Sequence, residues 1–256
     1  MRIDGKTALI TGGSAGIGKA IAQKLGEEGA RIAICGRSQE RLQGAVSAMS
    51  AAGIEVLQAA CDVRKLKDVE QFVDAAVTRY GSINILVNNV GAIQETPLAE
   101  ANDEAWHRIL QTVLDGTYYF TSRVLKHMPD DGRIVNISGV LGKVGVPGST
   151  AYCAAKHGLI GFARAAALEL APRGITVNTV CPGWVDTDLA REVMEGIAAG
   201  VGMTYDEVRR DALGRVPLGQ MIQPEEIASL VHFLVSSAGA NITGQAYNIS
   251  GGQVMH

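Results

Sequence analysis

Residues 7–18 read TALITGGSAGIG: a short apolar run leads directly into a cluster of glycines and then into a segment of helical period. Three of these glycines have distinct roles. Gly12 permits a tight turn, Gly16 lets the main chain approach a pyrophosphate, and Gly18 allows a helix to pack closely on a strand. The N-terminus of the following helix offers free N–H groups to the anion. An ordinary flexible turn is the alternative, but the strand–turn–helix context favours a dinucleotide site.

The same alternation of short apolar runs and longer helical patterns continues to the end of the chain. Strands that are almost entirely apolar are covered on both faces, which predicts a parallel sheet with helices on each side. Since parallel crossovers are right-handed, we expect an α/β fold, a doubly wound parallel sheet of the Rossmann type with its ligand crevice beyond the carboxyl ends of the strands. The expected strands are residues 7–10, 31–35, 55–60, 83–87, 133–137, 176–180 and 246–249, and the expected helices begin near residues 16 and 38 or span about 65–80, 103–127, 151–170 and 224–236.

The composition excludes several classes of protein. The chain has 256 residues, 47% hydrophobic and 19% charged, which is enough for residues 1–256 to form a single domain around one large core. The net charge of −3 is too small and too evenly mixed for nucleic acid or an acidic membrane surface to be the main partner. The four cysteines form no C-x-x-C pair, so neither a metal site nor a disulfide framework is expected. No signal peptide or membrane-spanning length of apolar residues is visible, which predicts a soluble, cytoplasmic protein.

One stretch breaks the alternation of strands and helices. About residues 186–215 lie between the sixth strand and the last helix and carry amphipathic, partly helical sequence. An insertion of this length in a compact fold is usually functional. We therefore expect a substrate lid over the crevice.

Further motifs follow the glycines in a fixed order. The glycine spacing is G-x-x-x-G-x-G after Thr11, residues 88–91 read NNVG, residues 152–156 read YCAAK, and residues 181–183 read CPG. Together they resemble the glycine-rich, NNAG, YxxxK and PG motifs of the short-chain dehydrogenase/reductase family, over about residues 5–252. Within that family the chain looks closest to 3-oxoacyl and polyketide ketoreductases and hydroxybutyrate-type dehydrogenases. The resemblance implies an oxidoreductase that interconverts a ketone and a secondary alcohol with a nicotinamide cofactor, in a homotetramer.

The end of the second expected strand bears on the choice of cofactor. An NAD enzyme places a carboxylate there for the ribose hydroxyls, whereas this sequence has Gly36 followed by Arg37 and Ser38. Arg37 can pair with a 2′-phosphate through its planar guanidinium, helped by Ser38 and Ser14, so NADP is favoured over NAD. A solvated arginine at a helix start is the alternative. The predicted cofactor-binding residues are Gly12, Ser14, Gly16, Ile17, Gly18, Arg37, Ser38, Asp62, Val63, Asn89, Gly91, Tyr152, Lys156, Pro182, Gly183 and Val185. Of these, Asp62 and Val63 resemble the family's adenine contacts, and Asp62 could also be a helix N-cap.

Tyr152 and Lys156 are the predicted acid/base pair. They stand four residues apart on an expected helix and therefore share a face. An ammonium beside a phenol stabilises the phenolate, so we expect the pKa of Tyr152 to fall from about 10 towards neutrality. The resemblance implies that Lys156 also binds the nicotinamide ribose. A surface Tyr–Lys pair is the alternative.

Two positions depart from the family's catalytic tetrad. The serine expected thirteen residues before the tyrosine falls on Gly139, and Ser138 beside it would point to the opposite face of a regular strand. Ser138 could still polarise the carbonyl if the strand end is bulged or if the loop 139–151 is one residue longer than the family norm, with Ser149 or Thr150 as substitutes. An ordinary serine at a strand end is the alternative. The expected asparagine falls on Val113, which lacks the amide that would support a local helix distortion. A nucleotide-binding homologue with impaired catalysis, acting as a sensor or structural subunit, is therefore the alternative to an active ketoreductase.

Overall fold

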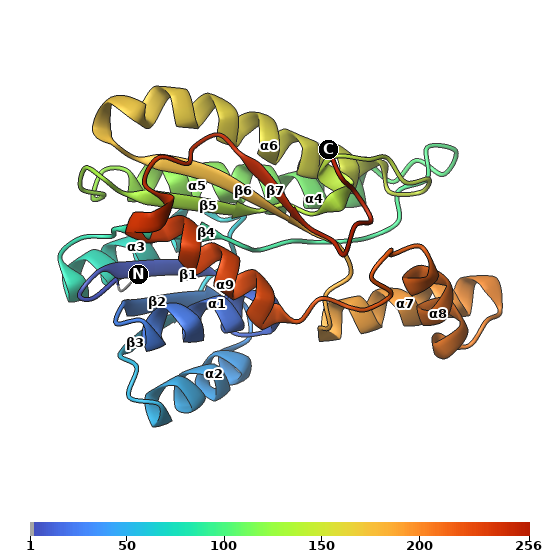
Figure 1. Ribbon diagram of the computed structural model, residues 1–256, viewed down its shortest axis with the longest axis horizontal. Helices are drawn as coiled ribbons and strands as arrows, with labels where there is room; N and C mark the ends of the chain where they lie inside the picture. The colour runs from blue at the N-terminus through green and yellow to red at the C-terminus, as the bar shows by residue number, and fades with distance from the viewer. Residues whose placement is uncertain (1–2) are drawn as a thin grey trace.

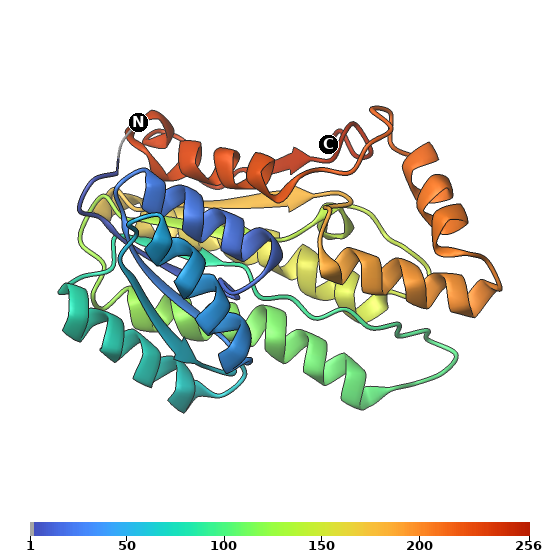
Figure 2. The ribbon, with the colours of Figure 1, turned by 90° about the horizontal axis from the view of Figure 1, so that it is seen from below.

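The computed structural model describes residues 3–256 and shows, within them, one seven-stranded sheet with helices on both faces (Figures 1 and 2). The strand order is β3-β2-β1-β4-β5-β6-β7, and the paired strands are parallel. The chain changes direction across the sheet between β1 and β4, which is the doubly wound arrangement. The predicted α/β fold is therefore confirmed. The strands are β1 (Thr7–Thr11), β2 (Arg31–Gly36), β3 (Val56–Ala60), β4 (Ile85–Asn88), β5 (Arg133–Ile137), β6 (Thr176–Pro182) and β7 (Ala246–Ile249).

The helices form two layers, one on each face of the sheet. Helices α1, α2 and α9 pack on one face, and α3, α5 and α6 on the other. No helix among residues 3–256 has both the length and the apolar character needed to span a bilayer. The bounds are α1 (Gly16–Glu27), α2 (Gln39–Ala51), α3 (Leu66–Tyr80), α4 (Asp103–Leu110), α5 (Gly116–Val124), α6 (Thr150–Leu170), α7 (Asp188–Val201), α8 (Tyr205–Gly214) and α9 (Pro224–Val235), with a π turn η1 (Gln111–Asp115) and 3₁₀ turns η2 (Val140–Gly142), η3 (Ala171–Arg173) and η4 (Ser237–Gly239).

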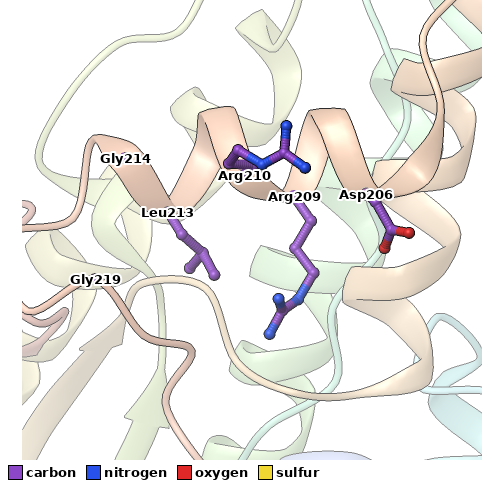
Figure 3. A pocket seen from close by; sticks show the side chains of 6 residues that line it. All are labelled: Asp206, Arg209, Arg210, Leu213, Gly214 and Gly219. Atoms are coloured by element: carbon purple, nitrogen blue, oxygen red, sulfur yellow. The ribbon is translucent and has the colours of Figure 1, made fainter.

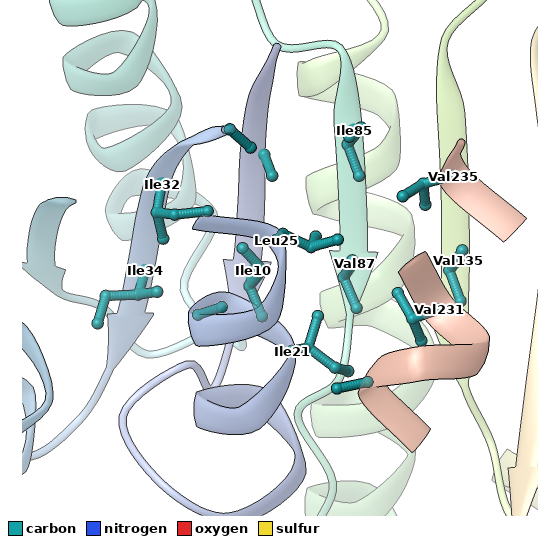
Figure 4. Packing of buried hydrophobic residues seen from close by; sticks show 14 of the residues in the cluster. Ile10, Ile21, Leu25, Ile32, Ile34, Ile85, Val87, Val135, Val231 and Val235 are labelled. Carbon is teal, nitrogen blue, oxygen red and sulfur yellow. The ribbon is translucent and has the colours of Figure 1, made fainter. Parts of the chain in front are cut away.

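The strands are apolar on both faces because each face meets a helix layer. Along β1, Ile10 packs in the layer of α1, α2 and α9, whereas its neighbour Leu9 packs in the layer of α3, α5 and α6. Figure 4 shows the first of these layers, where Ile21 of α1 and Val231 of α9 meet the sheet. Burying a side chain of this size contributes about 1.5–3 kcal/mol, so the two layers hold the strand ends in fixed positions.

Some element bounds differ from the sequence-based expectation. Residues 103–127 were expected to form one helix but form α4, the π turn η1 and α5 in succession. Strand β6 runs two residues beyond its expected end and includes Pro182. Both differences fall where the chain approaches the carboxyl edge of the sheet, and both involve candidate site residues.

Residues 186–215 contain α7 and α8, which lie at the end of the molecule towards which the strands point (Figures 1 and 2). The two helices share a small apolar cluster that includes Met194, Val208 and Leu213, with Trp184 packed against it. Helix α7 is capped by Thr187, whose side chain accepts the N–H of Ala190. The segment is thus an ordered pair of helices beside the crevice.

Candidate active site

The glycine-rich loop after β1 leaves its main chain open to a phosphate. A β-carbon on Gly18 would lie 2.3 Å from the carbonyl oxygen of Gly12, so only glycine lets α1 begin this close to β1. Gly12 has a φ of 67°, in the left-handed region that favours glycine. Asn89 holds the loop by donating from its side-chain nitrogen to the carbonyl oxygen of Thr11 at 3.1 Å. The N-cap residue Ala15 supplies no side-chain cap, so the first N–H groups of α1 are left for an anion.

Thr11 has a structural role that the sequence analysis missed. Its hydroxyl oxygen accepts the main-chain N–H of Asn89 at 2.9 Å and of Val90 at 3.3 Å. Beside it, the Asn88 side chain donates to the Asn136 side-chain oxygen at 2.9 Å. Residues 88–91 are therefore held between β1 and β5. The signal available in the sequence was a polar residue ending an otherwise apolar strand.

The residues predicted to select the 2′-phosphate lie together at the ends of β1 and β2. A β-carbon on Gly36 would lie 3.0 Å from the hydroxyl oxygen of Ser14, so a carboxylate-bearing side chain would crowd Ser14. Arg37 is exposed, and Ser38 caps α2 by accepting the N–H of Arg41 at 3.2 Å. This corner offers hydroxyls and a guanidinium to a ligand and no carboxylate, which fits a phosphate better than a pair of ribose hydroxyls.

Asp62 is held by a partner that the sequence analysis did not name. Its carboxylate accepts hydrogen bonds from Arg64, at 2.6 Å from Nη2 and 2.9 Å from Nε, and this guanidinium lowers the pKa of Asp62. The N-cap position of α3 belongs to Lys65, so the interpretation of Asp62 as a helix cap is wrong. Val63 is buried in the core layer of α3, α5 and α6. Ile17 is partly buried against the opposite layer.

Three segments converge on the amine of Lys156. Its Nζ is 5.5 Å from the ring centroid of Tyr152, one turn earlier on α6. The same nitrogen donates a 2.8 Å hydrogen bond to the carbonyl oxygen of Ile137, the last residue of β5. A β-carbon on Gly91 would lie 3.8 Å from it. The α6 pair, the end of β5 and residues 88–91 therefore meet at the carboxyl edge of the sheet.

The pKa of Tyr152 moves in the direction opposite to the expected one. Burial raises the pKa of Tyr152 to about 12 and lowers the pKa of Lys156 to about 8. The expected fall of the phenol pKa is thus wrong. The reason is that the amine of Lys156 is directed to Ile137, so loss of hydration dominates the titration of the phenol. At neutral pH Tyr152 is therefore a protonated phenol.

Ser138 faces helix α6. Its hydroxyl donates to the carbonyl oxygen of Lys156 at 2.9 Å, and the residue is 4% exposed. A β-carbon on Gly142 would lie 2.4 Å from this hydroxyl oxygen, so η2 closes over it. Gly139 has a φ of 157°, and the nearest atom to a β-carbon built on it is the carbonyl oxygen of Pro182 at 3.7 Å. The strand end thus directs Ser138 into the protein and leaves space at Gly139.

The hydroxyls proposed as substitutes differ in their partners. Thr150 donates to the carbonyl oxygen of Thr96 at 2.6 Å, and the two threonine hydroxyls are 3.2 Å apart. The hydroxyl of Thr96 also accepts the N–H of Ala151 at 3.1 Å. These bonds fasten the segment around Thr96 to the start of α6. Ser149 occupies the N-cap position of α6 without capping it, and its side chain is half-buried.

The helix distortion expected to need an asparagine is present around Val113. Residues 111–115 form the π turn η1, and Val113 is fully buried. The carbonyl oxygen of Val113 accepts a 2.7 Å hydrogen bond from the hydroxyl of Thr117. The reasoning that valine would not support a distortion is therefore wrong, because a threonine on the following turn partners the carbonyl. Thr117 was not singled out in the sequence.

The segment after β6 contacts both the C-terminal residues and the glycine-rich loop. A β-carbon on Gly183 would lie 2.9 Å from the side-chain oxygen of Gln253. Val185 is buried and forms an isolated parallel bridge to Ile222. Further along, Thr187 lies against the loop, since a β-carbon on Gly16 would be 3.1 Å from its methyl group. Pro182, Gly183 and Val185 are thus placed at the crevice by their neighbours in the fold.

A hollow of about 510 Å³ lies beside α8, away from this convergence. It is lined by Asp206, Arg209, Arg210, Leu213, Gly214 and Gly219 (Figure 3). These residues belong to α8 and the loop that follows it. The hollow shares no residue with the Tyr152–Lys156 pair, so the candidate active site rests on the converging strand ends.

Comparison with known proteins gives one family. The model of the short chain dehydrogenase family matches residues 6–198. A crystal structure of a variant actinorhodin polyketide ketoreductase with NADPH is 41% identical, with a TM-score of 0.94 over 97% of each chain. The 3-oxoacyl-[acyl-carrier-protein] reductase of Vibrio cholerae is 37% identical over 100% of both chains. The D-beta-hydroxybutyrate dehydrogenase of Cupriavidus necator is 35% identical over 98% of this chain and 99% of its own.

Proposed function

Because the chain belongs to the short-chain dehydrogenase family, we propose that it is an NADP(H)-dependent ketoreductase in which Tyr152 is the proton donor and Lys156 its partner. The observation that carries the proposal is the convergence of Tyr152, Lys156 and Gly91 beside the end of β5. That point lies at the carboxyl edge of the sheet, where doubly wound folds bind their ligands.

The glycine-rich loop and the β2 corner support NADP as the cofactor. The uncapped start of α1 would receive the pyrophosphate, and Arg37, Ser38 and Ser14 would surround the 2′-phosphate. Reduced NADP would supply the hydride that the carbonyl carbon gains. The carboxylate-free corner at Gly36 distinguishes this choice from NAD, and the solved ketoreductase relative binds NADPH.

The protonation of Tyr152 fits its proposed role as the proton donor. With a pKa of about 12 the phenol is protonated at neutral pH, so it is ready to give a proton to a carbonyl oxygen. Lys156 keeps its place through the bond to Ile137 and reaches towards the position beside Gly91.

The relatives indicate the substrate class. One reduces 3-oxoacyl groups and another is a polyketide ketoreductase, so we propose a 3-oxoacyl-like or cyclic ketone. Residues 1–256 act as one cofactor-binding domain in this proposal, with residues 186–215 as the substrate lid and a homotetramer as the assembly. Size-exclusion chromatography with light scattering tests the assembly.

Loss of NADPH absorbance with a panel of β-ketoesters, diketones and cyclic ketones tests the activity. We expect reduction of at least one class with NADPH and much slower reduction with NADH. Tyr152→Phe is the matched control, because it keeps the ring and removes the proton. NADPH binding without reduction of any ketone would favour the alternative, a nucleotide-binding sensor or structural subunit.

A further inference from the structure

The proposed reaction leaves negative charge on the carbonyl oxygen, and that charge needs hydrogen-bond donors. Tyr152 is one donor. Ser138 is committed to the carbonyl oxygen of Lys156 and enclosed by Gly142. Thr150 is committed to the carbonyl oxygen of Thr96. Three serine or threonine hydroxyls were considered as groups that could polarise the carbonyl. Of these, only that of Ser149, at the N-cap of α6, does not donate to a main-chain carbonyl oxygen in this way.

At Gly139, the volume that a side chain would occupy is open. A β-carbon there would have only the carbonyl oxygen of Pro182 within 4 Å, at 3.7 Å. Gly139 directly follows Ile137 and Ser138, which both contact Lys156. The space therefore opens at the same strand end as the Tyr152–Lys156 pair, and its nearest wall is a hydrogen-bond acceptor.

We infer that the space at Gly139 is a substrate subsite for a hydroxyl group that the substrate itself carries beside its ketone, and that this hydroxyl polarises the ketone in place of a protein side chain. The inference rests on the proposed ketoreductase function. In the reaction the carbonyl carbon gains a hydride from NADPH, which becomes NADP⁺, and the carbonyl oxygen takes the proton of Tyr152. The substrate hydroxyl only donates a hydrogen bond and keeps its own proton.

This assignment names a substrate class by its chemistry. The hydroxyl must lie close enough to the ketone to form an internal hydrogen bond. Aryl ketones with an ortho phenol, enols of 1,3-diketones and β-hydroxyketones satisfy this condition. Simple ketones do not, and they would meet Tyr152 as their one donor.

The test compares ortho-hydroxyacetophenone with para-hydroxyacetophenone. Both isomers have a hydroxyl conjugated with the ketone, but only the ortho isomer donates internally. The ratio of their kcat/KM values is divided by the ratio of their rates with borohydride in water buffered at the pH of the enzyme assay, where both phenols are protonated. There water donates to the ketone of the para isomer, and the internal hydrogen bond serves the ortho isomer. We expect a normalised preference for the ortho isomer of about 10²-fold, the effect of one preorganised donor.

Two variants at Gly139 distinguish the effect of filling the subsite from the effect of adding a hydrogen-bond donor. Gly139→Ala fills the subsite without a donor, so turnover of the ortho isomer should fall while the para isomer gains nothing. Gly139→Ser should speed reduction of the para isomer by at least about tenfold and bring the normalised ratio near one. Calorimetry with the NADP⁺ complex, which cannot reduce the ketone, should show weaker binding of the ortho isomer to Gly139→Ala and unchanged binding of the para isomer.

Several outcomes would overturn the inference. One is a normalised ratio near one in the wild type with both isomers reduced, and another is failure of either isomer to bind while other ketones are reduced. Collapse of para-isomer turnover in Ser138→Ala or Ser149→Ala would assign the donor to the protein. NADPH fluorescence checks that each variant is folded, and if the Gly139 variants fail this check, the wild-type ratio and the serine variants decide. Failure of the proposed function would look different, because no ketone in the panel would be reduced.

Discussion

The loop after β1 and the loop after β5 both end buried parallel strands at the same edge of the sheet, yet they keep to the family pattern to different degrees. After β1, Gly12, Gly16 and Gly18 are required by contacts shorter than a side chain allows or by a left-handed backbone. After β5, Gly139 stands where the family has a serine; its β-carbon position has no close contact, but its φ of 157° is one that other residues rarely adopt. Phosphate recognition uses main-chain geometry that few residues permit, whereas carbonyl polarisation needs only a donor, whatever molecule supplies it.

Tyr152→Phe is expected to have the largest effect on the β5–α6 side. Removing the phenolic proton while keeping the ring should lower turnover at least about 10²-fold and leave NADPH affinity nearly unchanged. Stopped-flow reduction and fluorescence titration of NADPH measure the two quantities. Wild-type turnover in the variant would show that another group is the acid and would remove the basis for comparing the two loops.

On the β1–β2 side, Arg37→Ala should weaken NADPH binding by about 1.5–3 kcal/mol and barely change NADH binding, because only NADPH carries the 2′-phosphate. Titration of both cofactors against wild type and variant gives the result. Equal losses for the two cofactors would contradict the proposed role of Arg37. Arg41→Ala, a neighbouring exposed arginine on α2, is the matched control.

The buried amine of Lys156 should make the free energy of unfolding depend on pH. Its pKa of about 8 in the folded protein lies below the ordinary 10.5, so the unfolded chain binds more protons between these values and stability rises with pH there. Below pH 8 the buried charge costs about 3 kcal/mol, partly offset by the bond to Ile137. Lys156→Met should therefore be about 1–2 kcal/mol more stable than wild type at neutral pH. Urea unfolding should show that this advantage largely disappears near pH 10, and an advantage independent of pH would refute the explanation.

Thr117→Val should have the smallest effect. It leaves the carbonyl oxygen of the buried Val113 without its 2.7 Å partner, at a cost of about 1 kcal/mol in unfolding free energy. If the π turn supports Lys156 and its surroundings, turnover should fall together with stability. Thr112→Val on the same turn is the control for helix propensity, because Thr112 is half-buried and its hydroxyl donates to the carbonyl oxygen of Arg108 instead. Equal effects of the two variants would show that the π turn has no special dependence on Thr117.

The sequence by itself was enough to determine the order of the elements, the doubly wound sheet and the convergence of Tyr152 and Lys156. It was also enough to exclude a carboxylate at the β2 corner. Composition, period and spacing are local properties of the chain and do not depend on its tertiary contacts. The direction of Ser138 and the survival of the π turn at Val113 were decided by contacts formed on folding. Each depends on a residue distant in the chain or on the next helical turn. The pKa of Tyr152 depends on tertiary structure for the same reason. The sequence spacing places Lys156 nearby, but burial and the carbonyl oxygen of Ile137 determine whether the charge of Lys156 stabilises the phenolate.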